Sequence, residues 1–169
     1  MKVIEKIVTG AANFLAVAGL TILLILATFA LFDGLLRSLA NYPLDIVREI
    51  GDLVAAVSAA CCLPIALLHK NNITLRIFEK ILPPAGARVI DVFADILMTV
   101  VMVAMAWQFY LFGVKTMRAN DVTWMLNVPK APFWFVVDGI LWVAVVVQAF
   151  VLIQMITGAR IERIEESAL

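Results

Sequence analysis

The chain has 169 residues, of which 64% are hydrophobic and 15% are charged, and its mean hydropathy is +1.03. Soluble domains are about 45–50% apolar and about 25% charged, so this composition excludes an ordinary soluble domain and indicates an integral membrane protein. Because the formal net charge is zero, no basic field points to nucleic acid as a partner.

The cysteine and histidine residues indicate neither a catalytic site nor a metal or haem site. Cys61 and Cys62 are adjacent within an apolar run, and His69 is the single histidine. Adjacent cysteines match neither a disulfide framework nor metal-ligand spacing, and a haem held between two histidines needs a second one. Phosphate loops, nucleophile elbows and zinc-protease motifs are also absent from the sequence. We therefore expect no catalytic residue, no metal, no cofactor and no enzymatic activity.

The first apolar segment carries no charge from residue 7 to residue 32. As a helix it would be about 39 Å long, which spans the roughly 30 Å of hydrocarbon with some tilt. A cleaved signal peptide is the alternative, but the run is too long for a typical signal core and ends in no clean small-x-small site. We expect the helix to end at Asp33 and Arg37, which are four residues apart and can form an ion pair.

The second segment, residues 47–68, follows a turn at Pro43 and begins in a polar cluster. Its uncharged part is short, so the helix must carry acidic residues on its first turns, where the helix dipole favours them. Arg48 and Asp52 are four apart and can neutralise each other. Arg48, Glu49 and Asp52 are either interfacial capping charges or polar contacts with a partner subunit, because charges this close to the bilayer core are usually paired.

Residues 72–82 are amphipathic if they are helical. Their polar residues fall on a narrow arc opposite a broad apolar one, which suits a short helix in the interface plane. A short strand remains the alternative, because apolar residues also alternate here. Four apolar residues of this segment are candidate partner contacts: Ile73, Ile77, Phe78 and Ile81.

The third and fourth segments, 92–114 and 133–159, flank a polar loop over 120–130 that contains Trp124. Asp138 lies inside the fourth segment, where an ionised and unpaired carboxylate would be costly. We expect it near the outer interface, paired with Lys115 or Arg118 or with a partner subunit, and count it as a candidate partner contact. The deep positions of all four segments are almost purely apolar, with Pro64 the one clear helix breaker.

Basic residues set the expected orientation. Of the 13 lysines and arginines, eight fall on the side of the termini and five on the other. This bias favours both termini in the cytoplasm. The sequence therefore predicts an all-α membrane protein forming a single domain over 1–169, with four transmembrane helices and a short amphipathic interfacial helix.

Several stretches together carry a family resemblance. They are the proline-led residues 42–50, the polar stretch 69–75 leading to Leu-Pro at 82–83, and Asn-Val-Pro at 127–129 before an aromatic-rich helix. In length, layout and these motifs the chain resembles the small membrane subunit of tripartite ATP-independent periplasmic (TRAP) transporters. Ile46 stands where members usually carry tryptophan, and Arg48 replaces one of two acids.

The resemblance implies a function and partners. The small subunit would act as a scaffold in sodium-coupled uptake of organic acids across the bacterial inner membrane. It would bind a large elevator-type membrane subunit and help to dock a periplasmic substrate-binding protein, which binds transiently. Two alternatives stay open: a small four-helix multidrug exporter, which would want an acid near the bilayer centre, and a membrane assembly subunit of another family.

Overall fold

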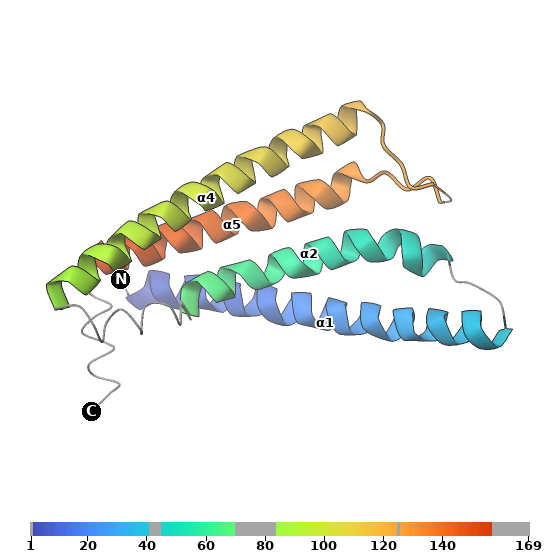
Figure 1. The fold of residues 1–169 in the computed structure, drawn as a ribbon, viewed down its shortest axis with the longest axis horizontal. Helices are drawn as coiled ribbons and strands as arrows, with labels where there is room; N and C mark the ends of the chain where they lie inside the picture. The colour runs from blue at the N-terminus through green and yellow to red at the C-terminus, as the bar shows by residue number, and fades with distance from the viewer. Residues whose placement is uncertain (1, 41–44, 70–83, 125, 157–169) are drawn as a thin grey trace.

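In a computed structural model, the chain is described for residues 2–40, 45–69, 84–124 and 126–156, and these residues form four long helices (Figure 1). They are α1 (Lys2–Ala40), α2 (Asp45–His69), α4 (Pro84–Arg118) and α5 (Ala131–Ile156). Each is long and apolar enough to cross a membrane, and the described residues form no strand beyond one isolated bridge. The all-helical prediction is thereby confirmed for these residues, whereas the expected interfacial helix over 72–82 lies outside them.

Helix α1 continues beyond its expected end. The prediction that it ends at Asp33 and Arg37 is wrong, because the helix runs on to Ala40. The expected ion pair does form, with Arg37 Nη2 lying 3.7 Å from Asp33 Oδ2. A pair with this spacing supports a helix rather than ending it, and Gly34 between them costs only about 1 kcal/mol of helix propensity.

Helix α2 also continues past the proline that was expected to break it. Pro64 lies inside the helix, which continues to His69. A proline ring removes one backbone hydrogen bond, and neighbouring helices offset this loss in membrane proteins. The Pro64 side chain is fully buried, so packing against the neighbours holds the helix through this position.

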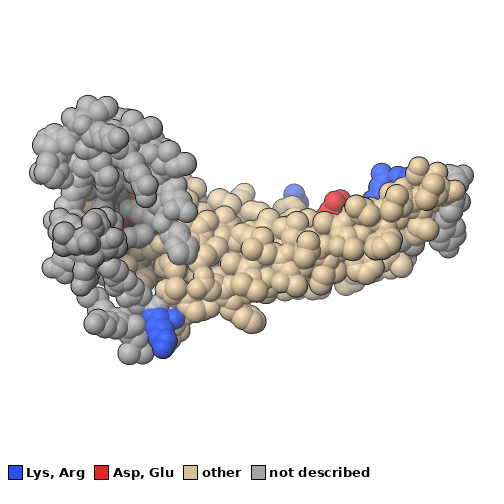
Figure 2. Space-filling view, turned by 90° about the horizontal axis from the view of Figure 1, so that it is seen from below, with Lys and Arg blue, Asp and Glu red and all other residues tan. Residues whose placement is uncertain are grey.

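The four helices form one open layer in the order α1, α2, α5, α4 (Figure 1). Among the described residues, α1 packs mainly on α2, α2 on α5 and α5 on α4, so that each outer helix has one principal neighbour. The end of α1, the start of α2 and the loop between α4 and α5 lie at the same end of the layer (Figure 1). From below, a broad band without lysine, arginine or acidic side chains separates the charged groups visible toward the two ends (Figure 2). This arrangement suits a bilayer.

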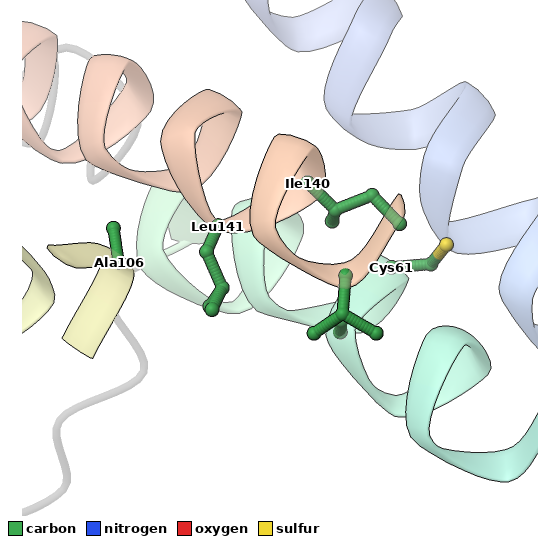
Figure 3. Packing of buried hydrophobic residues seen from close by; sticks show 6 residues of the cluster. Cys61, Ala106, Ile140 and Leu141 are labelled. Carbon is green, nitrogen blue, oxygen red and sulfur yellow. The ribbon is translucent and has the colours of Figure 1, made fainter. Parts of the chain in front are cut away.

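Small residues bring neighbouring helices together. The position that a Cβ on Gly19 would occupy is 2.6 Å from Cys61 Cβ and 2.9 Å from the Ser58 carbonyl oxygen, so α1 and α2 touch backbone to backbone there. Beyond this crossing, Cys61 of α2 belongs to one buried cluster with Ala106 of α4 and with Ile140 and Leu141 of α5 (Figure 3). Close approach through small side chains is how membrane helices gain packing contacts without a hydrophobic driving force.

Candidate partner-binding surfaces

The polar cluster at the start of α2 contacts the loop between α4 and α5. Glu49 Oε2 accepts a hydrogen bond of 3.0 Å from the backbone N–H of Leu126. Arg48 and Asp52 are exposed, and within the described part of the chain no ion pair joins them, contrary to our expectation. Exposed charges gain little from pairing, so the absence of this pair costs the isolated chain little. Of the three candidates, Glu49 is the one that holds another element in place.

The loop that Glu49 holds is a small hairpin built from residues 121–124 and 126–130. Two backbone bonds close it, Thr123 N–H to the Val128 oxygen at 3.0 Å and Lys130 N–H to the Asp121 oxygen at 3.1 Å. The Thr123 hydroxyl oxygen also accepts a 3.0 Å hydrogen bond from the Val128 N–H. The sequence analysis predicted only a polar loop here.

Two asparagines shape this loop. Asn120 and Asn127 have φ values of 54° and 52°. Asparagine tolerates this left-handed region better than other side chains, so the two asparagines were the signal from which a tight turn could have been found. At the tip of the hairpin, Trp124 is 95% exposed and makes almost no contact with the rest of the chain.

Asp138 is buried inside α5 and does not pair with Lys115 or Arg118, the two basic residues expected as partners within the chain. It is seven residues from the start of α5, or about 10 Å along the helix, and is only 7% exposed. Among the described residues its Oδ1 has no hydrogen-bond partner, and no ion pair joins Asp138 to Lys115 or Arg118. Both basic residues are exposed at the end of α4, where long cationic side chains extend toward water rather than into hydrocarbon.

A second buried polar contact was missed by the sequence analysis. Gln148 of α5 is 2% exposed, and its Nε2 donates a 3.4 Å hydrogen bond to the backbone oxygen of Asp95 on α4. The Thr99 hydroxyl donates to the same oxygen at 2.7 Å. Counting uncharged runs passes over glutamine, so the signal available was a neutral polar residue inside the fourth apolar run. The contact ties α4 to α5.

An apolar groove lies between α1 and α2 near their loop end. It encloses about 370 Å³, and its lining is almost entirely apolar. The residues that line it are Ile22, Ile25, Leu26, Phe29, Ile46, Val47, Ile50, Gly51 and Val54. The groove offers no polar group that could orient a substrate, so it fits hydrocarbon contact rather than solute binding.

The outer helices leave broad apolar faces uncovered. The buried share of the most apolar stretch is 11% in α1 and 17% in α4. In the inner helices it is higher, 33% in α2 and 39% in α5. On α1, Val17, Leu24 and Leu31 recur every seven residues and are 64%, 70% and 63% exposed, so they form one continuous ridge. Such faces must be covered by lipid or by another membrane protein.

A comparison with protein-family models identifies the chain. The model described as "Tripartite ATP-independent periplasmic transporters, DctQ component" matches residues 24–160, which is most of the chain. The chain belongs to this family. As a DctQ component it is the small membrane component of a TRAP transporter and a multi-pass membrane protein, and its family is one of transporter components rather than enzymes. No curated protein and no solved structure matched the chain in the corresponding comparisons.

The DctQ family works within a tripartite system, so other transporter components are its partners in general. Of the candidate contacts, the structure brings Glu49 to the hairpin, places Arg48 and Asp52 on the exposed end of α2, and buries Asp138 in α5. The remaining four, Ile73, Ile77, Phe78 and Ile81, lie outside the described residues and stay predictions.

Proposed function

We propose that this DctQ component is the scaffold subunit of a sodium-coupled uptake system for organic acids in the bacterial inner membrane. In this proposal it holds a large elevator-type membrane subunit, and a periplasmic binding protein delivers the substrate. Membership of the DctQ family supports its place in a tripartite transporter. The scaffold role, the coupling ion and the substrate class extend beyond what that membership carries.

The observation that supports the scaffold role is the open layer of helices. A helix bundle that works alone buries its apolar stripes against one another. Here α1 and α4 form the two edges of a layer and keep most of their apolar surface exposed. A layer of this shape is suited to lie against a larger membrane protein and to stay fixed while part of that protein moves.

The middle of the layer argues against transport by this chain alone. Carriers bind ions and substrates near the bilayer centre with broken helices or buried polar groups. Among the described residues, the buried acids Asp95 and Asp138 lie away from the middle of their spans, Val92–Arg118 and Ala131–Gln154. The middle of the layer is filled by residues such as Ala106 and Leu141. Substrate and sodium sites therefore belong, in this proposal, to the large subunit.

Reconstitution tests the proposed function. With an inward sodium gradient and the binding protein outside, liposomes that hold both membrane subunits should take up the organic acid that the binding protein carries. Liposomes with this chain alone should take up none, and liposomes with the large subunit alone should take up less than those with both. Sodium-driven uptake by this chain alone would refute the scaffold role.

Co-purification tests the proposed contacts. In this proposal Arg48, Glu49 and Asp52 meet the partners at the outer end, and the stretch with Ile77 fixes the height of the subunit. Arg48→Glu and Ile77→Asp should each lower the amount of large subunit retained on tagged small subunit. Arg118→Glu, which reverses an exposed charge on α4 at the same end of the layer, serves as the matched control.

A further inference from the structure

We propose that the outer face of α4 is the surface that meets the large membrane subunit. Gln108 lies at the centre of this contact and forms a hydrogen bond with a transmembrane helix of that subunit. The uncovered face of α1, in contrast, is left to lipid. This inference rests on the proposed function and adds to it the helix of this chain that faces the partner.

The first support is the depth of Gln108 in the bilayer. The uncharged run of α4 extends from Ile96 to Val114, about 29 Å as a helix, which matches the roughly 30 Å of hydrocarbon. Met105 is the midpoint of this run, so Gln108 lies about 4.5 Å from the bilayer centre along the helix. Helical side chains lean toward the N-terminus of their helix, which directs the Gln108 side chain toward the centre rather than toward water.

The second support is that the chain itself leaves this amide without a partner. Gln108 is exposed on the outer face of α4, and within the described part of the chain its side chain forms no hydrogen bond. Hydrocarbon offers neither a donor nor an acceptor, so an amide there loses the hydrogen bonds that it makes in water. Gln148 on α5 is the satisfied case, because its amide donates to the backbone oxygen of Asp95. Gln108 therefore needs a polar group from another membrane protein.

The third support is the spacing of the exposed residues around Gln108. Side chains separated by alternating steps of three and four residues share one stripe of a helix, and such stripes form the seam of left-handed helix pairs. Ala104, one turn before Gln108, lets a second helix come close enough for the amide to reach it. A single polar residue within an apolar seam also fixes the register of the pair. The exposed residues of α4 with this spacing are Leu97, Val101, Ala104, Gln108, Leu111 and Lys115, which we call the α4 seam.

The other outer helix, α1, has polar groups that need no partner protein. Thr21 and Thr28 are exposed, and their hydroxyls donate to the backbone oxygens of Val17 and Leu24 at 2.8 Å and 2.9 Å. Asn13 lies six residues inside the uncharged run of α1, and its side chain leans toward the water at that end. Lipid can therefore cover this face, whereas lipid would leave Gln108 on α4 unpaired.

The charge at one end of the α4 seam argues against a second copy of the chain as the partner. Copies in one membrane have the same orientation, so a two-fold contact through this seam would bring the Lys115 side chains of both copies together. Like charges juxtaposed at an interface weaken association. The seam instead fits a helix of different sequence, with a hydrogen-bonding group opposite Gln108 and no cation opposite Lys115. Arg118, a turn further on, lies beyond the seam.

Photo-crosslinking locates the partner. The photoreactive residue benzoylphenylalanine replaces Leu111, on the α4 seam, in the co-expressed transporter complex. It replaces Leu24, on the exposed ridge of α1, in a matched second variant. Irradiation should join position 111 to the large subunit and should give no such product at position 24.

The other outcomes of this experiment separate the inference from the proposed function. A product of two copies of this chain, or no product of position 111 with the large subunit while the complex still co-purifies, would overturn the proposed face and leave the scaffold role intact. A product of position 24 with the large subunit would refute the assignment of α1 to lipid. Subunits that do not co-purify at all would refute the proposed function, and this inference with it.

A substitution tests the role of Gln108 itself. Gln108→Leu should lower the association constant of the two subunits in liposomes about threefold, the usual weight of one polar contact between membrane helices. Val103→Leu, at an exposed position off the seam, is the matched control and should leave the constant unchanged. Energy transfer between fluorescently labelled subunits measures both. Neither substitution should move the thermal midpoint of the isolated chain, because both side chains are exposed. Association of Gln108→Leu at the strength of the unmodified chain, or a matching loss of stability in the isolated chain, would refute the contact at Gln108.

Discussion

Two acids near the same end of the molecule have different surroundings. Glu49 lies on the first turns of α2 and accepts a backbone hydrogen bond from another element. Asp138 lies two turns inside α5, nearly fully buried, and its Oδ1 finds no donor among the described residues. An acid at a boundary can combine water with a protein donor, whereas one inside the layer depends on what its neighbours provide. The positions in the sequence were sufficient to flag both residues but not to tell them apart.

Replacing Asp138 by asparagine should stabilise the isolated chain. The amide removes charge from a buried site that offers Oδ1 no donor, which is worth on the order of 1 kcal/mol. We expect the thermal midpoint in detergent to rise by about 2–4 °C. Asp33→Asn, which weakens the partly exposed pair with Arg37, should shift it much less. If the midpoint of Asp138→Asn falls below that control, Asp138 makes a stabilising contact in the isolated chain.

Replacing Gln148 by leucine should cost little. Polar contacts between membrane helices contribute about 0.6 kcal/mol on average, and the Asp95 oxygen keeps the Thr99 hydroxyl as a donor. The thermal midpoint of Gln148→Leu should therefore fall by no more than about 2 °C. A much larger fall would show that Gln148 does more than share one carbonyl oxygen.

At the scale of elements, close contact decides how neighbouring helices pack. Long apolar runs predict that helices exist, but they do not say which faces meet. The meeting of α1 and α2 depends on Gly19, where backbone approaches backbone, whereas Gly10 on the same helix has nothing within 4 Å. The sequence analysis did not single out Gly19, since a glycine in an apolar run carries no mark of its contact.

Gly19→Ala should destabilise the chain. A Cβ there would lie 2.6 Å from Cys61 Cβ, so the helices must move apart, at a cost of about 1–3 kcal/mol. Gly10→Ala is the matched control and should stabilise by about 0.5–1 kcal/mol, because alanine favours the helix and meets no neighbour. Thermal midpoints of both variants in detergent measure the difference. Equal midpoints would show that α1 and α2 do not cross closely at Gly19.

At the scale of the whole molecule, the two ends of the open layer carry different parts of the chain. The end of α1 and the start of α2 share one end of the layer with the hairpin, while α1 begins at the other (Figure 1). From the eight-to-five distribution of basic residues we expect the hairpin end to lie outside the cell.

Cysteine labelling measures this orientation. In a Cys61→Ala, Cys62→Ala background, Ala119→Cys should react with a membrane-impermeant maleimide added to intact cells, and Lys6→Cys should react only after the membrane is opened. Both residues are exposed, and Ala119 avoids the positive φ of Asn120, so neither substitution strains the fold. The opposite pattern would reverse the orientation.

The sequence by itself determined that the chain crosses a membrane with four helices, because the length and apolarity of each run are local properties. Its motifs at residues 42–50, 69–75 and 127–129 carried the resemblance to a TRAP small subunit, which the family model supports. Local periodicity also predicted the pair of Asp33 with Arg37, which share one face of one helix. Only the tertiary structure decided that the helices lie in one open layer, that Asp138 forms no ion pair with Lys115 or Arg118, and that Glu49 holds the hairpin. These features depend on contacts between residues far apart in the chain. In a chain apolar on nearly every helix face, hydrophobic periodicity cannot choose those contacts, so the fit of small residues and the few buried polar groups decides them.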